Sequence, residues 1–580
     1  MTIPLRQYWI LLRIYLKPAW LKVTLLTILL FANTGLLLVN PLLLRRFLDS
    51  AQRGDALTAL TRIAATFIGV AVVAQILGVC ESYVAEDVGW TATNRLRGDL
   101  MRHVLDLDMG FHTAHVPGEL TQRIDYDVST LANFFSRFIL RVVASLLLLL
   151  GVLLVLFGIN PVIGVTFAGF VVIALVALRS IQRVIVPFAK VDLQTVAALF
   201  GYLEERLTGT EDIRSRGAID HVLRGLYGHM RTRMRARRNA DLMYTALLGM
   251  VGLLTAIGTA LAYALGGSLF RHGAITIGTV FAVVSYIALV IAPLNQLTQQ
   301  VQDLQQATAG IIRVQELLDT SSAIQDGRGA SLPVGALSVT CTHLSFDYRQ
   351  DAPVLDDLSF TIEPGTVLGI LGRTGSGKST LARLLVRLYD PTHGSIQLGD
   401  VDLRDTRQRE IRQRVGLVTQ EVQLFHGSIR DNVTLFDPAI PEAQILQAFR
   451  DLGLWDWYTA LPAGLETELA GGDAGLSAGE AQLLAFARVF LRDPGLVILD
   501  EASSRLDPTT ERRIERAVDV LLRGRTGIIV AHRLGTVERA QAILILDDGR
   551  IVEQGRRESL AADPTSRYAG LRRTGLAVMP

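Results

Sequence analysis

The chain has 580 residues, too many for one hydrophobic core, so we expect at least two domains. Half of its residues are hydrophobic, only 19% are charged and the mean hydropathy is +0.35. Because a soluble domain carries roughly a quarter of charged residues, part of this chain is expected in lipid. The net charge of +2 argues against a protein that is held on nucleic acid by bulk positive charge. Two cysteines, Cys80 and Cys341, are too few for a disulfide framework.

Six stretches of the first half are long and apolar enough to cross a bilayer, for which a helix needs about 20 residues. They are residues 20–44, 60–83, 138–158, 161–185, 243–270 and 276–296. The residues before the first stretch predict an amphipathic helix on the cytoplasmic surface, because no small-residue cleavage site follows their apolar run. Inside the spans, Asn33, Asn40 and Gln75 favour hydrogen bonds between helices, with substrate contact as the alternative.

Two long polar segments interrupt the spans and predict their orientation. Residues 84–137 follow the second span, and residues 186–242 follow the fourth. The later segment is crowded with arginine, as in "MRTRMRARRNAD", and positive charge stays on the cytoplasmic side; a merely solvated helical face is the alternative. Arg45, Arg46 and Arg53 oppose this rule locally. The even number of spans still predicts a multi-pass protein of the cell membrane (inner or plasma membrane) with both termini in the cytoplasm.

A phosphate-binding motif marks the second half, where charge rises and apolar runs shorten from about Leu337. The stretch "TVLGILGRTGSGKSTLARLL" is an apolar strand, a glycine loop and a helix, and it contains the pattern G-x-x-x-x-G-K-S. The glycines let backbone N–H groups surround phosphate oxygens, Lys378 reaches the outer phosphates, and the Ser379 hydroxyl suits Mg²⁺. Lys378 is the only lysine after Lys190, and a compact charge suits this cradle better than a planar guanidinium. The residues predicted to bind ATP here are Gly372, Arg373, Thr374, Gly375, Ser376, Gly377, Lys378, Ser379 and Thr380.

Five further residues extend the predicted ATP site. A buried apolar strand ends in Asp500, which suits a magnesium ligand, and Glu501, which polarises the attacking water. Another apolar strand ends at His532, which contacts the γ-phosphate or the water. Gln420 also follows an apolar run and reaches the metal and the water, so the predicted metal ligands are Ser379, Gln420 and Asp500. Tyr348, upstream of the glycine loop, stacks on the base. Taken singly, the histidine and the tyrosine would be assigned structural roles.

The order of these motifs resembles the nucleotide-binding domain of ATP-binding cassette (ABC) transporters: Tyr348, the P-loop, Gln420, "LSAGE", "LVILDE", "SSRLD" and His532. The six spans resemble the membrane domain of the exporter-type branch. The stretches "DMGFHTAHVPGELTQRIDYDV" and "EERLTGTEDIRSRGA" resemble its two intracellular loops. The resemblance implies a membrane α-helical domain with six transmembrane helices in residues 1–320, a linker in 321–336 and an α/β P-loop nucleotide-binding domain in 337–580.

The resemblance also implies a mechanism. Two such domains pair head to tail, and each ATP lies between the P-loop of one and the signature helix of the other, where Ser477 and Gly479 approach the γ-phosphate. ATP closes this sandwich, hydrolysis assisted by Glu501 reopens it, and the spans alternate their access. The expected cofactors are ATP and Mg²⁺. The expected partners are the bilayer, a second half-transporter and an amphipathic, lipid-like or drug-like substrate that is exported.

Two alternative functions remain open at this level. The first is an importer on the exporter fold, which some siderophore uptake systems resemble. The second is a membrane regulator that uses ATP closure as a signal and transports nothing.

Three departures from the family pattern lie where the resemblance places the partner chain. The signature L-S-G-G-Q reads L-S-A-G-E, with Ala478 and Glu480 changed. Arg505 replaces alanine in S-A-L-D, and Gly471 stands where the preceding loop usually has glutamate. At ~8 Å and an effective dielectric of ~20, Glu480 would repel a triphosphate by about 2 kcal/mol per unit charge. Because this chain's own ATP residues are intact, we predict a heterodimer with one degenerate site; neutral drift is the alternative.

Overall fold

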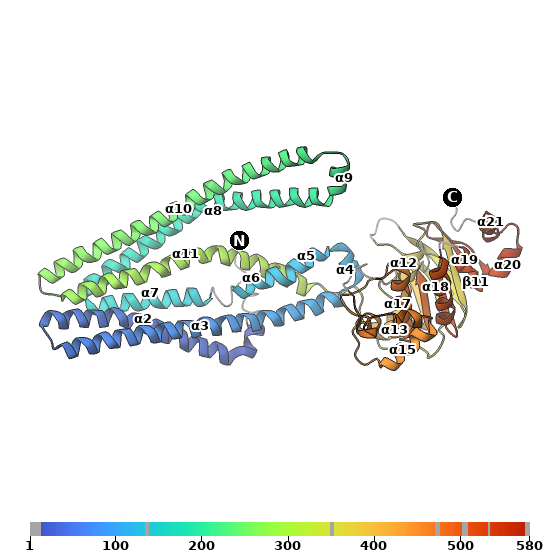
Figure 1. Ribbon diagram of the computed structural model, residues 1–580, viewed down its shortest axis with the longest axis horizontal. Coiled ribbons are helices and arrows are strands. Elements are labelled where there is room, and N and C mark those ends of the chain that lie inside the picture. Colours follow the sequence, from blue (N-terminus) through green and yellow to red (C-terminus); the bar gives the residue numbers. More distant parts are fainter. Residues whose placement is uncertain are drawn as a thin grey trace. The chain divides into compact units, whose positions relative to one another are not determined.

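The computed structural model describes residues 13–133, 139–348, 353–469, 476–500, 508–531 and 534–574. The chain forms two compact units (Figure 1). The first consists of Met1–Leu105 and Pro117–Thr320, and the second consists of Asp106–Val116 and Ser321–Pro580. One unit is helical and the other is α/β, which confirms the predicted fold class.

The first unit is built of long helices that follow the apolar runs of the sequence. They are α2 (Trp20–Arg53), α3 (Leu57–Asp106), α7 (Ile139–Ile159), α8 (Pro161–Thr208), α10 (Ile219–Arg271) and α11 (Ile277–Asp319). Side-chain caps fix two of the starts: Asn160 accepts a hydrogen bond from the Val162 N–H in α8, and Thr276 accepts one from the Thr279 N–H in α11. Gly54, in the left-handed region at φ 76°, ends α2. Shorter elements are η1 (Lys17–Ala19), α5 (Pro117–Thr121), the π-helical turn η2 (Gln122–Asp127), α6 (Val128–Asn133) and α9 (Thr210–Ser215).

Among the described residues, five helices are long and apolar enough to cross a membrane. They are Arg13–Arg53, Leu57–Asp106, Val142–Ile159, Pro161–Thr208 and Ile219–Arg271. The first five predicted spans fall on these helices. The sixth predicted span falls in α11, which begins with the shorter apolar stretch Ile277–Ile291. The predicted amphipathic helix before the first span lies mostly in residues 1–12, outside the described residues.

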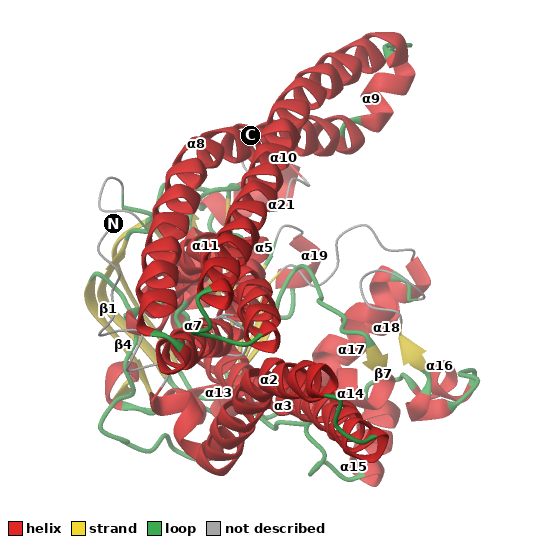
Figure 2. Cartoon of the chain, turned by 90° about the vertical axis from the view of Figure 1, so that its left-hand side faces the viewer, coloured by secondary structure: helices red, strands yellow, loops and turns green. Residues whose placement is uncertain are grey.

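The long helices pack around a shared apolar core. Helices α8 and α10 run side by side in both views (Figures 1 and 2), and α11 packs against α2, α7 and α10. Gly258 of α10 permits close approach, because a Cβ there would lie 2.9 Å from the Phe170 ring. Tyr286 is fully buried, and its hydroxyl donates to the Leu38 carbonyl over 2.7 Å. The polar end of this core residue is therefore paired.

Polar side chains join α2 to α3 within the apolar part of the unit. The Asn33 amide donates to a Glu81 carboxylate oxygen over 2.9 Å, which confirms the hydrogen bond between helices predicted for Asn33. Gln75 is exposed on α3. The Asn40 side-chain oxygen is buried, with no hydrogen-bond partner in the part of the chain that the structure describes. The carboxylate of Glu81, inside the second predicted span, was not singled out from the sequence.

The second unit is organised by a six-stranded sheet in the order β12-β11-β3-β10-β9-β6. Its strands are β3 (Val367–Gly372), β6 (Val415–Val418), β9 (Leu496–Asp500), β10 (Thr526–Val530), β11 (Ala542–Asp547) and β12 (Arg550–Arg556). All are parallel except β12, which pairs antiparallel at one edge. Successive side chains enter opposite cores: Ile498 and Ile528 face one, and Leu499 and Ile529 face the other. Burial on both faces explains why these strands are apolar throughout.

Two smaller groups cover the faces of this sheet. One is an antiparallel sheet in the order β2-β1-β4-β5, formed by β1 (Val339–Phe346), β2 (Leu355–Ile362), β4 (His393–Leu398) and β5 (Val401–Asp402). The other is helical, with the small hairpin of β7 (Gly427–Ser428) and β8 (Glu468–Leu469). Helices of the unit are α12 (Lys378–Leu385), α13 (Gln408–Arg414), α14 (Ile429–Thr434), α15 (Glu442–Asp451), α16 (Trp455–Thr459), α17 (Ala478–Phe490), α18 (Pro508–Leu522), α19 (Leu534–Val537), α20 (Arg557–Ala562) and α21 (Arg567–Thr574), with the 3-10 turns η4 (Leu403–Asp405) and η5 (Gly464–Glu466).

One short segment of the first long excursion packs with the second unit. It contains α4 (Met109–Ala114), whose N-cap Asp108 accepts hydrogen bonds from the Phe111 N–H at 3.0 Å and the Ala323 N–H at 2.7 Å. Burial opposes the charge of Asp108, but these backbone donors prevail and hold the pKa of its carboxyl below the usual value. The Thr113 hydroxyl lies 3.3 Å from the Tyr389 hydroxyl. These contacts explain why residues 106–116 belong to the second unit.

Replacing Asp108 with alanine is expected to loosen α4, because both backbone donors lose their acceptor, at a cost of about 1 kcal/mol. Thermal unfolding of the purified protein measures the effect. The stabilisation is present above pH ~4 and disappears as the pH falls through the lowered pKa, so the difference from wild type should shrink in acid. Asp106→Ala is the control, since Asp106 is exposed and has no side-chain partner among the described residues. Equal losses for both variants would contradict the prediction.

Candidate ATP-binding site

The predicted phosphate cradle forms where β3 ends and α12 begins. Strand β3 is buried along its whole length in the middle of the sheet, so the loop after it is held on a fixed base. Gly377, the N-cap of α12, has φ 96°, and a Cβ there would lie 2.4 Å from the Leu355 side chain. At Gly372, a Cβ would lie 2.2 Å from the Leu546 carbonyl. Both positions therefore require glycine for steric as well as conformational reasons.

The cradle encloses a cavity of about 460 Å³. Lys378 is buried, and its ammonium donates to the carbonyls of Gly372 at 2.8 Å and Arg373 at 2.7 Å. The Ser376 hydroxyl is buried and has no partner among the described residues. An unpaired buried hydroxyl, a fixed cation and the N-terminus of α12 together fit a phosphate group. The cavity is lined by Val354, Thr374, Gly375, Gly377, Lys378, Ser379, Thr380 and Gln420.

Gln420 is thus placed beside the P-loop, although it lies 41 residues beyond Ser379 in the numbering of the chain. It follows β6, at the far side of the sheet from β3. The parallel register also aligns Asp500, at the end of β9, with Val530 at the end of β10. Glu501 is the next residue after Asp500, and His532 comes two residues after Val530, but both lie outside the described residues. The structure consequently tests the position of Asp500 and not the positions of the other two.

Tyr348 lies beside the cradle and remains partly exposed. Its hydroxyl is 3.2 Å from the Thr380 hydroxyl, and Arg383 of α12 donates to it over 3.3 Å. The ring meets Phe346 and Tyr389 edge to face, at centroid distances of 4.8 Å and 5.2 Å. An aromatic ring held against α12 in this way suits a flat base, as the sequence predicts.

Helix α17 carries the altered signature. Ser477 is its N-cap, Ala478 is exposed and Gly479 is buried. At the other end, Arg488 donates to the Asn432 carbonyl over 2.6 Å and to the Gln423 carbonyl over 2.9 Å. Burial lowers the pKa of Arg488. Its guanidinium also donates to the Asn432 side-chain oxygen over 3.2 Å. Arg488 was not singled out from the sequence, because a lone arginine inside a helix carries no local signal.

Comparison with known proteins identifies the family. A family profile described as ABC transporter transmembrane region matches residues 23–294, and one described as ABC transporter matches residues 355–504. An uncharacterised ABC transporter ATP-binding protein of Bacillus subtilis is 30% identical over 97% of this chain and 94% of its own. The chain belongs to the ABC transporter family. A fatty acid ABC transporter ATP-binding/permease protein of Mycobacterium bovis is 33% identical over 81% of this chain and 74% of its own.

A solved structure places the ABC transporter in the exporter branch. The bacterial Atm1-family ABC exporter with ATP bound matches with a TM-score of 0.79 at 26% identity, over 95% of this chain and 98% of that one. The transporter therefore combines a multi-pass membrane region with an ATP-hydrolysing domain in one chain. Of the departures from the family pattern, Ala478 and Glu480 are described, whereas Gly471 and Arg505 lie outside the described residues.

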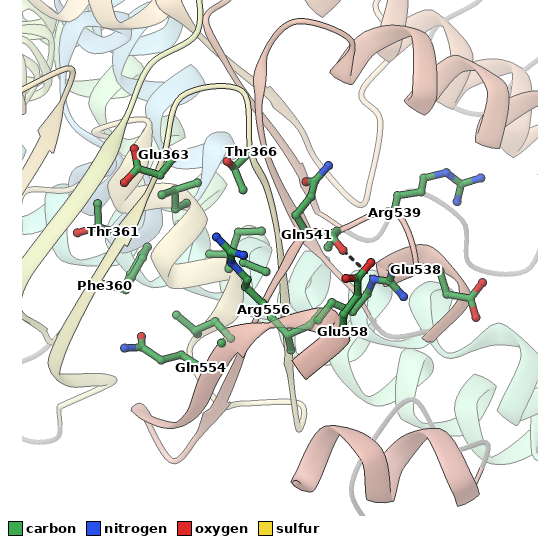
Figure 3. Close-up of a pocket in the computed structure, with 18 residues that line it drawn as sticks. Phe360, Thr361, Glu363, Thr366, Glu538, Arg539, Gln541, Gln554, Arg556 and Glu558 are labelled. Atoms are coloured by element: carbon green, nitrogen blue, oxygen red, sulfur yellow. Dashed lines mark hydrogen bonds between the residues drawn. The ribbon is translucent and has the colours of Figure 1, made fainter. Parts of the chain in front are cut away.

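A larger cavity of about 770 Å³ lies away from the P-loop of the transporter (Figure 3). It is lined by the first residues of β3 and β11, so it occupies the opposite end of the sheet from the cradle. Arg539 on its wall is paired with Asp519 and Glu515, and Arg557 donates to the Ala540 carbonyl. Acidic and basic side chains are mixed around it. This cavity lacks the glycine loop and the excess positive charge that a triphosphate needs.

Replacing Lys378 with arginine is expected to lower ATP hydrolysis at least about 100-fold, because a planar guanidinium does not fit between the two carbonyls that hold the ammonium. The ATPase rate of the purified transporter in lipid measures this. Lys190→Arg is the matched control, because Lys190 is exposed, and it should retain the wild-type rate. A K378R variant with near-normal activity would show that this fit does not matter.

Replacing Arg488 with methionine is expected to destabilise the ATPase domain by about 2 kcal/mol, because the carbonyls of Asn432 and Gln423 lose their donor. The apparent melting temperature should fall by about 4–8 °C. Arg492→Met removes an exposed arginine just beyond the same helix and should leave the melting temperature unchanged. Similar shifts in the two variants would argue against a special role for Arg488.

Proposed function

We propose that the transporter exports an amphipathic, lipid-like or drug-like substrate by alternating access, driven by ATP, as one half of a dimer with a different partner chain. The exporter-type fold supports the direction, and the similarity to a fatty acid transporter supports a lipid-like substrate. The membrane is proposed to be the cell membrane, with both termini in the cytoplasm. The domain division proposed is 1–320 and 337–580, joined by residues 321–336.

We propose the following roles for the site residues. The P-loop from Gly372 to Thr380 cradles the phosphates, and Tyr348 supports the base. Glu501 orients and polarises the attacking water, and His532 contacts the γ-phosphate. These roles are proposals that rest on the cavity beside β3 and on the strand ends that meet at the same edge of the sheet.

Magnesium fits the oxygen donors of this site. The Ser379 hydroxyl and the Gln420 amide oxygen line one cavity, and the Asp500 carboxylate ends a neighbouring strand. Oxygen ligands of this kind, together with substrate phosphates, are those that Mg²⁺ prefers. We propose that these three residues hold it, directly or through water. Bound there, the ion would neutralise charge on the phosphates.

The proposal of a different partner rests on the contrast between the two faces of the ATPase domain. The ATP-site residues of this chain keep the family pattern, whereas its signature helix carries Ala478 and Glu480. In a head-to-tail pair, that helix completes the ATP site of the partner. The ATP site formed by the P-loop of this chain would then hydrolyse ATP faster. The site that its signature helix completes on the partner would hydrolyse ATP more slowly.

Co-expression tests this function. We expect the chain with its partner to form a stable 1:1 complex, to hydrolyse ATP faster than the chain alone, and to move substrate into inverted membrane vesicles. Dimer mass, ATPase rate and vesicle uptake are the measurements. Glu501→Gln in the complex should abolish uptake while ATP binding persists, because that carboxylate acts on the water. Full activity from the chain purified alone would contradict the heterodimer, and movement out of inverted vesicles would contradict export.

A further inference from the structure

The altered signature forms a closed capping box at the start of α17. One Glu480 carboxylate oxygen accepts the Ser477 N–H at 2.7 Å and the Ser477 O–H at 2.8 Å. The Ser477 oxygen in turn accepts the Glu480 N–H at 3.3 Å. Both donors of Ser477 are therefore committed to a negative charge carried by the same turn of helix.

A second capping box in the same domain shows what this arrangement does for structure alone. At the start of α14, the Asp431 carboxylate accepts the Ser428 N–H at 3.1 Å and the Ser428 O–H at 2.8 Å. The chemistry is the same, but Ser428 is buried with only 5% of its surface exposed. Ser477 is exposed. The capping box at α14 therefore stabilises a helix start inside the domain. The capping box at α17 lies at the surface, where the donors of Ser477 are accessible to another molecule.

We infer that Glu480 competes with the γ-phosphate of ATP for the donors of Ser477, and so lowers the preference for ATP over ADP at the site that α17 completes. The inference rests on the proposed function, in which this helix closes over nucleotide held by another chain. A γ-phosphate must displace the carboxylate from the Ser477 hydroxyl or lie close to its charge. ADP has no γ-phosphate and meets neither penalty. Glu480 thereby acts as a specificity-determining residue rather than as a defect.

Two variants separate competition from helix capping. Glu480→Gln removes the charge but keeps an amide oxygen, which accepts the Ser477 donors more weakly than a carboxylate does; the cap remains while the competition with phosphate weakens. Glu480→Ala removes the charge and the carboxylate half of the box, whereas the backbone N–H of residue 480 can still donate to the Ser477 oxygen. Competition predicts that both variants bind ATP more tightly, whereas a purely structural cap predicts that Glu480→Gln changes nothing and Glu480→Ala weakens the domain. Asp431→Asn is the matched control, since it removes the charge from the buried box.

The experiment uses the full-length dimer in lipid, with fluorescent ADP displaced by the non-hydrolysable analogue AMP-PNP or by unlabelled ADP. We expect Glu480→Gln to tighten AMP-PNP binding at least about tenfold, equivalent to about 1.4 kcal/mol, with ADP affinity changed less than about twofold. Glu480→Ala should shift the ratio in the same direction, and Asp431→Asn should leave it unchanged. An unchanged ratio in Glu480→Gln, or an equal shift in Asp431→Asn, would overturn the inference.

The same measurements test the role of Glu480 and the heterodimer proposal independently. In a heterodimer, the shift should appear at one of two sites; in a dimer of identical chains, it should appear at both. A shift at both sites would contradict the proposal that the partner is a different chain, but it would support the role of Glu480. A heterodimer whose nucleotide ratio does not respond to Glu480→Gln would support the partner and overturn the inference.

Discussion

The position of β3 in the middle of a parallel sheet is the constraint on which the ATP site depends. Parallel strands end at the same edge, so the C-terminal ends of β3, β10 and β9 lie next to one another there. Because β3 is buried on both faces, close packing fixes the position at which the glycine loop begins. Lys378 is held by two carbonyls of that loop, those of Gly372 and Arg373.

A run of side-chain contacts links the surroundings of the P-loop to more distant parts of the second unit. Tyr348 contacts Tyr389 edge to face, and the Tyr389 hydroxyl lies beside Thr113 in the segment that carries α4. Asp108 secures that segment through backbone hydrogen bonds. A short run of contacts therefore joins the aromatic ring beside the P-loop to residues that belong, in the chain order, to an excursion from the membrane region. Each contact is local and modest, but together they make the segment part of the ATPase unit.

The two ends of helix α17 are held by different kinds of hydrogen bond. Arg488 binds carbonyls of the segment that follows Gln420, so this end is tied to the interior by charged hydrogen bonds. Ser477 and Glu480 close the other end on itself and leave it exposed. The C-terminal end of α17 is held by Arg488, and its N-terminal hydrogen bonds are made within its own capping box. The helix therefore needs no contact with a second chain to satisfy the donors at its N-terminus. The glutamate that looks like damage in the motif completes the cap of the helix.

The sequence by itself determined the elements whose signal lies in neighbouring residues. Apolar runs indicated the membrane helices, and the strand–glycine–lysine pattern indicated the cradle with its residues, because hydrophobic length and steric demands at Gly372 and Gly377 are local properties. Only the tertiary structure decided which distant residues meet. It placed residues 106–116 in the second unit, paired Asn33 with Glu81, and set Arg488 against Asn432. It also showed that Glu480 holds Ser477, since two residues three positions apart form a capping box only where a helix begins at the first of them. Such contacts depend on the path of the folded backbone, which no short stretch of residues encodes.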